Sequence, residues 1–287
     1  MSTKPTSLPR LAEKELIRQL RTGQSRHEAK IREGIHDPEG IFSYNTFRSY
    51  EKHCRAFCKW VKSEHPECRT LKDALEYVPD YLKMRIDRGL SSYTVHLDAS
   101  ALAKLYHCQS KDFGVKLPSR ERKNITRSRG SKTHDKHFSE KNNRAVVDFC
   151  RGTGLRRHEL KALKVGDVAP DGSWVRVRRG KGGKPRTVPV LPAYQKHVAK
   201  CVADAKGKSV FESKAIKQRM DVHSYRREYA NALYRSYVRN LKTLSNQEKY
   251  FCRKDKAGIV YDREAMLIVS RALGHNRIDV IAEHYLD

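Results

Sequence analysis

The sequence predicts a mainly α-helical protein with a small antiparallel sheet, organised as two domains. Three observations lead to this prediction. A chain of 287 residues is longer than one domain of ordinary size and fits two. Apolar residues recur at helical spacing in both halves of the chain. One stretch, residues 174–190, alternates apolar and basic residues and then returns after a glycine-rich turn, as a β-hairpin does.

The charge of the chain indicates its partner. Lys and Arg number 60 against 33 Asp and Glu, which gives a formal net charge of +27 and a pI near 9.9. The excess is spread over both halves. This distribution favours double-stranded DNA as the partner over nonspecific solubility, because many basic side chains can then contact phosphates.

The seven cysteines have no repeating spacing, so they argue against a disulfide framework and for a reducing compartment. A metal site is conceivable in the first half, but Cys54 and Cys58 lie four apart on an apolar helix face, so we expect buried thiols and no metal. The residues considered for such a site are Cys54, Cys58, Cys68, His53 and His65. The absence of a long apolar run or signal peptide predicts a cytoplasmic, DNA-associated protein without membrane contact.

The N-terminal half predicts a compact bundle of about four helices. Residues 1–8 should be disordered, and residues 9–23 should form a short basic helix that either touches DNA or leads into the first domain. The packed bundle should begin near Ile41. Its helices are expected at residues 45–63 with Asn45 or Thr46 as cap, at 71–78, at 79–89 with Pro79 in the first turn, and from Ser91 or Ser92 onward.

Residues 116–136 predict an extended linker, because they include eight basic and two acidic residues and hardly any apolar side chains. The linker is either a solvated spacer or a strand that follows a DNA backbone. The basic domains on both sides favour the second interpretation. The candidate DNA-binding residues are Arg120, Arg122, Lys123, Arg127, Arg129 and Lys132.

The second half predicts helices mixed with short strands. Helices are expected at residues 138–150 with Ser139 as cap, 155–163, 192–205, 222–239 and 263–273, followed by a last helix capped by Asn276 that reaches Tyr285. A short strand is expected at residues 165–168, and a hairpin pairs residues 174–178 with 187–190.

Three local features of the second half have chemical meaning. Arg156 follows a glycine turn that opens a helix, where backbone N–H groups favour an anion. His223 and Arg226 are three apart and share a helix face, although this spacing alone is weak evidence. Tyr285 follows a Leu-Gly-His triplet by ten residues. A tyrosine hydroxyl has an ordinary pKa of about 10, so as a nucleophile it needs cationic neighbours.

Together these features resemble the tyrosine recombinases, also called the phage integrase family. The resemblance rests on five motifs in the family's order: TGLRRHEL, the GKGGK hairpin, HSYR, LGH and a terminal Tyr. The predicted bundle is similar to that family's core-binding domain. The resemblance implies a clamp around DNA, with a basic N-terminal segment (residues 1–40), a core-binding domain (41–115), a basic linker (116–136) and a catalytic domain (137–287).

The resemblance also implies a role for each matching residue. Arg156 and Arg226 would hold the nonbridging oxygens of the scissile phosphate. His275 would donate a further hydrogen bond to these oxygens, and Tyr285 would attack phosphorus to give a 3′-phosphotyrosyl intermediate. The supporting residues would be Lys181 as general acid, His223 in proton transfer, and Glu159, which would orient Arg156. No metal or nucleotide cofactor is implied.

The chain departs from the family pattern at four places, one of which is His158, where the family usually has a small residue. The step from His275 to Tyr285 is one residue longer than usual, and we expect an irregular turn after Asn276 to absorb it. Residues 241–261 lengthen the gap between HSYR and LGH, either as a DNA or protein contact or as a tolerated surface loop. The sequence ends two residues after Tyr285, where relatives commonly continue, so we expect a shortened chain or a different assembly. Tyr261 is the next candidate nucleophile, but it precedes LGH.

The expected activity is that of a site-specific DNA recombinase, the integrase of a mobile element, with strand exchange through a Holliday junction. It would bind each site as a homodimer and form a tetramer in the synapse, with accessory DNA-bending or directionality factors as further partners. The alternatives are a non-catalytic DNA-binding protein of this fold and a type IB topoisomerase. Competent residues at all six catalytic positions disfavour the first, and the small helical first domain disfavours the second.

Overall fold

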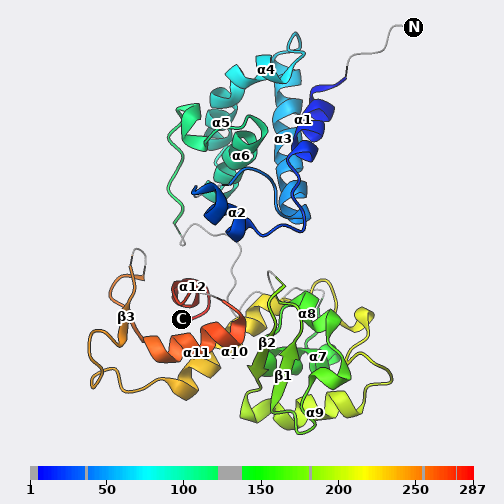
Figure 1. The fold of residues 1–287 in the computed structure, drawn as a ribbon, viewed down its shortest axis with the longest axis vertical. Helices are drawn as coiled ribbons and strands as arrows, with labels where there is room; N and C mark the ends of the chain where they lie inside the picture. Colours follow the sequence, from blue (N-terminus) through cyan, green and yellow to red (C-terminus); the bar gives the residue numbers. More distant parts are fainter. Residues whose placement is uncertain (1–5, 36–37, 122–137, 181–182, 254–255, 276) are drawn as a thin grey trace. The chain divides into compact units, whose positions relative to one another are not determined.

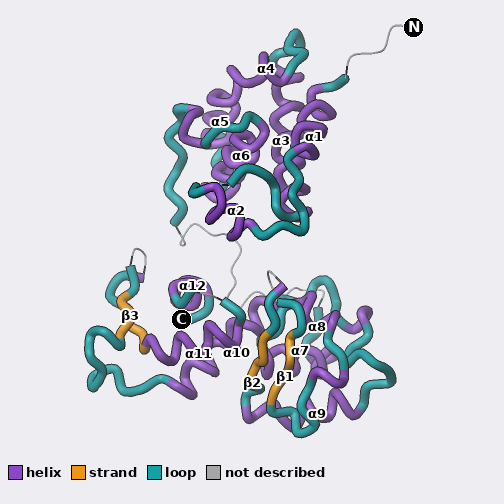
Figure 2. Tube along the Cα trace, viewed as in Figure 1, coloured by secondary structure: helices purple, strands orange, loops and turns teal. Residues whose placement is uncertain are grey.

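A computed structural model of the protein describes residues 6–35, 38–121, 138–180, 183–253, 256–275 and 277–287. The chain divides into two compact units, Met1–Thr126 (unit 1) and Arg127–Asp287 (unit 2). In the described residues unit 1 is helical, whereas unit 2 combines helices with two small antiparallel sheets (Figures 1 and 2). This confirms the predicted fold class, with a second two-stranded sheet beyond the one expected.

Unit 1 is built around a long central helix, α3, which contacts α1 and α6 along its length. The N-cap of α3 is Ser43, whose hydroxyl accepts the Thr46 N–H at 3.1 Å. The predicted caps Asn45 and Thr46 therefore lie inside the first turn of the helix, which begins earlier than predicted. The helices of this unit are α1 (Leu8–Arg18), α2 (Arg26–Glu33), α3 (Tyr44–Glu64), α4 (Leu71–Ala74), α5 (Val78–Asp87) and α6 (Ser92–Leu105).

The hydrophobic core of unit 1 includes α1 as well as the expected bundle. Leu8, Ala12 and Leu16 are buried in the same cluster as Ile41 and Leu102. The packed unit therefore starts before residue 41, because the apolar face of α1 covers α3 and α6. The division into four functional segments stays a prediction.

Cys54, Cys58 and Cys68 of unit 1 are buried thiols. Cys54 Sγ donates to the Ala101 carbonyl oxygen at 3.4 Å, and burial raises the pKa of the Cys58 thiol to about 12. His53 instead contacts the buried Asp98 carboxylate at 2.5 Å. Within the described parts of the chain, no cluster of three or more His, Cys, Asp or Glu side chains could hold a metal ion, and no helix is long and apolar enough to cross a bilayer.

The first half of unit 2 packs helices against the predicted hairpin, whose register pairs Trp174 with Pro189. Val175 and Val188 are buried and Arg176 is exposed, which confirms the alternation read from the sequence. The strand expected at residues 165–168 is instead a 3₁₀ turn, because the Asp167 carboxylate accepts the Lys164 N–H and closes the turn. The elements are α7 (Arg144–Thr153), α8 (Arg157–Ala162), β1 (Trp174–Val177), β2 (Arg186–Pro189) and α9 (Gln195–Ala203).

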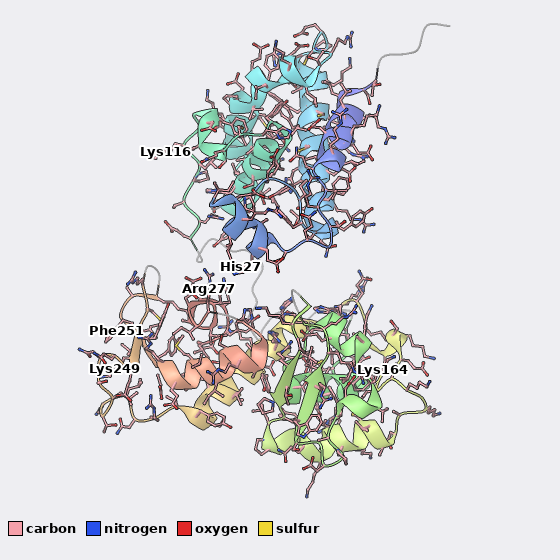
Figure 3. The ribbon with its side chains drawn as sticks, viewed as in Figure 1. His27, Lys116, Lys164, Lys249, Phe251 and Arg277 are labelled. Carbon is pink, nitrogen blue, oxygen red and sulfur yellow. The ribbon has the colours of Figure 1, made fainter. Side chains whose placement is uncertain are left out.

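The second half of unit 2 contains a second hairpin within the stretch that lengthens the family pattern. β3 pairs with β4, and Tyr261 is buried while Phe251 on β3 is 52% exposed (Figure 3). The last helix, α12, has Ile278 as its N-cap, and the predicted cap Asn276 lies outside the described residues. The elements are α10 (Val222–Tyr237), β3 (Lys249–Phe251), β4 (Val260–Asp262), α11 (Arg263–Leu273) and α12 (Asp279–His284).

Candidate active site

The turn between α7 and α8 fixes the position of Arg156. Gly154 ends α7 at a positive φ of 59°, and a β-carbon there would lie 2.4 Å from the Tyr229 ring, so only glycine fits. Arg156 is then the N-cap of α8, and its backbone N–H donates to Glu159 Oε2 at 2.8 Å. The side chain of Arg156 is 11% exposed. The first turn of α8 thus holds this guanidinium in a nearly buried position.

Glu159 is a buried carboxylate shared by two arginines. Arg156 Nη1 donates to Oε1 at 3.0 Å, while Arg186 Nη1 and Nη2 donate to the two oxygens at 2.8 and 2.7 Å. Burial raises the pKa of this carboxyl, but the hydrogen bonds and charge of Arg186, together with Arg156, outweigh burial and lower the pKa to about 2. Glu159 is therefore an anion that orients both guanidinium groups.

Arg186 was not among the predicted site residues, although its position in the predicted hairpin is a signal for it. It lies two residues before the buried Val188 on β2, so the period of a strand turns both side chains to the same inward face. Arg186 Nε also donates to the carbonyl oxygen of Ala272 near the end of α11, at 2.8 Å. One guanidinium thus connects α8, β2 and α11.

Arg226 on α10 is a buried cation, with 1% of its surface exposed. Its Nη1 and Nη2 donate to the carbonyl oxygens of Gly154 and Leu273, both at 2.5 Å, and its Nε donates to Tyr285 Oη at 3.3 Å. Burial lowers the pKa of Arg226 to about 10. Among the described residues no carboxylate forms an ion pair with it, so its positive charge is left to attract an anion.

His275 and Tyr285 complete the cluster from the C-terminal part of the chain. His275 follows Gly274, which ends α11 in the left-handed conformation, and its Nε2 lies 3.3 Å from Tyr285 Oη and 3.4 Å from Arg156 Nη2. α12 ends just before Tyr285, whose own backbone leaves the helical conformation (φ −125°, ψ −33°). The longer step from His275 to Tyr285 is thus accommodated, and Arg156, Arg226, His275 and Tyr285 lie together.

Of the remaining predicted residues, three are described and the others lie outside the described residues. His223 is exposed, one turn before Arg226 on α10, and its backbone N–H donates to Asp221 Oδ1 at 3.1 Å. Tyr261, the alternative nucleophile, is buried and donates to the Asp287 carbonyl oxygen at 2.7 Å. Arg120 is exposed in unit 1. Outside the described residues lie Lys181, Arg122, Lys123, Arg127, Arg129 and Lys132.

A model of the phage integrase family matches residues 131–287, more than half of the chain and nearly all of unit 2. The chain belongs to the phage integrase family. This family member is also 30% identical, over 155 residues, to the tyrosine recombinase XerA of Pyrococcus furiosus. The match covers 52% of the chain and 51% of XerA, so the chain spans about half the length of this curated relative.

Two solved structures share the fold of this phage integrase family member. One is the Tn1549 transposon integrase (residues 82–397) in complex with circular intermediate DNA, at 12% identity, a TM-score of 0.52, and coverage of 96% of this chain and 94% of the other. The second is a lambda integrase tetramer bound to a Holliday junction, at 16% identity, a TM-score of 0.51, and coverage of 91% and 76%. At these identities the likeness concerns the fold.

Replacing Glu159 with glutamine should lower the free energy of unfolding of this family member by about 3 kcal/mol at pH 7. The folded carboxyl has a pKa near 2 against an ordinary value of 4.5. Its charge therefore contributes fully above about pH 4.5, and the contribution is lost as the pH falls through about 2. Urea unfolding of both proteins between pH 7 and pH 3 measures the difference, which should shrink below pH 4.5.

The exposed Glu283 supplies the control, since Glu283→Gln should change the free energy of unfolding little at any pH. A Glu159→Gln effect of constant size across this pH range would contradict the assignment of Glu159 as a strongly stabilised anion.

Proposed function

We propose that the protein is a site-specific DNA recombinase that cuts and rejoins DNA through a covalent bond between Tyr285 and a 3′ phosphate. One observation supports the proposal above the others: the Tyr285 hydroxyl lies 3.3 Å from both Arg226 Nε and His275 Nε2, beside a buried arginine that has no ion-paired carboxylate among the described residues. A phosphodiester supplies the anion that such a cluster favours.

The proposed reaction is an in-line displacement at phosphorus. Tyr285 Oη forms a bond to phosphorus while the bond from phosphorus to the 5′ oxygen breaks, and the electron pair of that bond leaves on the 5′ oxygen. Arg156 and Arg226 stabilise the charge on the nonbridging oxygens, and His275 donates to the same group. His223 assists removal of the tyrosine proton, and Lys181 protonates the leaving oxygen. Attack by a 5′ hydroxyl reverses these steps and rejoins the strand.

The proposed assembly follows from the same reaction. Exchange of strands between two duplexes needs two cleaving subunits on each duplex, so we propose a dimer on each site, a tetramer in the synapse and a Holliday junction intermediate. The lambda integrase that shares this fold was solved as a tetramer on such a junction, and the Tn1549 integrase comes from a transposon. These likenesses favour an integrase of a mobile element, with a DNA clamp formed by both units.

The test of this function is a covalent adduct between the wild-type protein and DNA. Duplexes made from the DNA that flanks the gene are nicked near each candidate site, so that the short fragment that carries the new 5′ hydroxyl diffuses away and the adduct accumulates. We expect a protein–DNA adduct with DNA attached through its 3′ phosphate. A protein that binds these duplexes but forms no adduct would be a non-catalytic DNA-binding protein. Relaxation of supercoiled DNA without strand exchange would instead identify a type IB topoisomerase.

Lys181→Ala is expected to slow cleavage by about 10²- to 10⁴-fold, because the leaving 5′ oxygen loses its general acid. A 5′-thio leaving group needs no proton, so the same variant should cleave a 5′-phosphorothiolate substrate at nearly the wild-type rate. Lys184→Ala changes an exposed lysine of the same hairpin and is the control. A rate that stays low on the thio substrate would remove Lys181 from the role of acid.

A further inference from the structure

The backbone that carries Tyr285 is held from outside α12. α12 has six residues, too few to be stable as an isolated helix, so neighbouring elements must fix its position. On one side, Asn231 of α10 donates through Nδ2 to the Tyr285 carbonyl oxygen at 2.8 Å, and its Oδ1 accepts the Asp287 N–H at 3.2 Å. α10 also carries Arg226, so this contact ties the tyrosine to the helix of its arginine partner.

On the other side, the backbone is held by the second hairpin of unit 2. Lys256 Nζ donates to the carbonyl oxygens of Ala282 and Leu286, at 2.8 and 2.6 Å. These carbonyls lie at the C-terminal end of α12, where a lysine charge is favourable. Tyr261 Oη donates to the Asp287 carbonyl oxygen at 2.7 Å. Together the two side chains bind three carbonyls on both sides of Tyr285.

Further contacts within unit 2 position these two side chains. The Tyr261 ring is buried and packs edge-on against Tyr234 of α10, and Lys256 Nζ lies 5.9 Å from the centre of the Tyr261 ring. The next residue, Asp262, caps α11 and accepts from Arg239 Nη2 at 2.7 Å. Hydrogen bonds from Arg239 hold the pKa of Asp262 well below its usual range, so the carboxylate stays charged. The hairpin is thus fixed to both α10 and α11.

We propose that Lys256 and Tyr261 form a latch that holds Tyr285 beside Arg226 of the same chain, so that the nucleophile acts in cis. The inference rests on the proposed function for its chemistry, but the latch itself is a contact between the hairpin and the segment at residues 282–287. The stretch that lengthens the family pattern thus serves to position the nucleophile. Lys256 and Tyr261 are positioning residues, since they touch the backbone around Tyr285.

The first test measures the latch without DNA. In the variant Lys256→Met/Tyr261→Phe, hydrogen exchange of the Tyr285 and Leu286 amides, which both donate to the Ile281 carbonyl, should be at least about tenfold faster than in the wild type. The single variant Lys256→Arg keeps a cation at this position, so these two amides should exchange about as slowly as in the wild type. Lys242→Met changes an exposed lysine of the same stretch and should leave exchange unaltered. Equal exchange in the wild type and the double variant would overturn the latch, whatever the enzyme does.

The second test distinguishes cis from trans action. Tyr285→Phe lacks the nucleophile and Arg226→Ala lacks the cation, so a mixture of the two should form no adduct if Tyr285 acts in cis. The double latch variant should cleave about 100-fold more slowly than wild type with nearly equal DNA affinity, because a tyrosine displaced by about 1 Å loses that much rate. Adduct from the mixture, or an unchanged rate in the latch variant, would overturn the proposal. Absence of adduct in wild type would instead contradict the proposed function.

Discussion

Tyr285→Phe is expected to abolish the covalent protein–DNA adduct while leaving DNA affinity nearly unchanged. The ring remains in place, packed against His275 and 5.5 Å from the Arg226 guanidinium carbon, so only the hydroxyl is lost. Loss of the hydroxyl removes its contacts with Arg226 Nε and His275 Nε2, which changes stability by about 1–2 kcal/mol. Chemistry stops because phenylalanine has no atom that can bond to phosphorus.

Adduct formation on the nicked duplex and DNA binding by fluorescence anisotropy measure the two effects separately. Tyr237→Phe is the matched control, since Tyr237 is 49% exposed at the end of α10 and takes no part in the cluster. An adduct that persists in Tyr285→Phe would show that another residue, with Tyr261 as the first to test, is the nucleophile.

Arg226→Lys is expected to reduce the rate of cleavage by about 10²- to 10³-fold, although the charge is retained. The guanidinium reaches three acceptors at once, the carbonyl oxygens of Gly154 and Leu273 and the Tyr285 hydroxyl. A lysine ammonium is a point charge that cannot keep this fork while it holds a phosphate oxygen. Carbonyls left unpaired in the core should also lower the free energy of unfolding by about 1–3 kcal/mol.

Two measurements separate these consequences of Arg226→Lys. Single-turnover cleavage reports the loss of rate, and urea unfolding reports the loss of stability. Orthovanadate, a phosphate-like anion, should raise the melting temperature of wild type and do so much less in the variant. Arg235→Lys, on the exposed surface of the same helix, is the control. Cleavage at the wild-type rate by Arg226→Lys would remove the guanidinium fork from the proposed mechanism.

The proximity of Arg156, Arg226, His275 and Tyr285 was expected from the resemblance to the phage integrase family, and local rules position each residue only within its own element. Gly154 and Gly274 both adopt positive φ at helix ends, which sets the residues just after them, and Arg226 lies at a fixed position in a long helix. The hairpin of β1 and β2 followed from the two-residue period of Val175, Val177 and Val188. Roles for His223, Lys181 and the linker residues remain predictions.

Other features depend on contacts between distant residues, which a local pattern does not contain. The second hairpin has strands of only three residues, and Arg239 stabilises it by reaching Asp262 and Glu248. The expected strand at residues 165–168 failed for a local reason, since the capping carboxylate of Asp167 outweighed the strand preference of two valines. The partner of Arg186 could not be assigned, because Glu159 lies 27 residues away in the chain.

The shared carboxylate of Glu159 has a consequence for how this protein can diversify. Replacement of Glu159 alone leaves Arg186 charged and 9% exposed without its main partner. Replacement of Arg186 alone likewise leaves the buried Glu159 carboxylate without the arginine that forms two hydrogen bonds with it. Each single step therefore passes through a less stable intermediate, and the Ala272 carbonyl on α11 is affected as well. We expect descendants of this gene to keep both residues or to exchange them together, so that the pair is inherited as one unit.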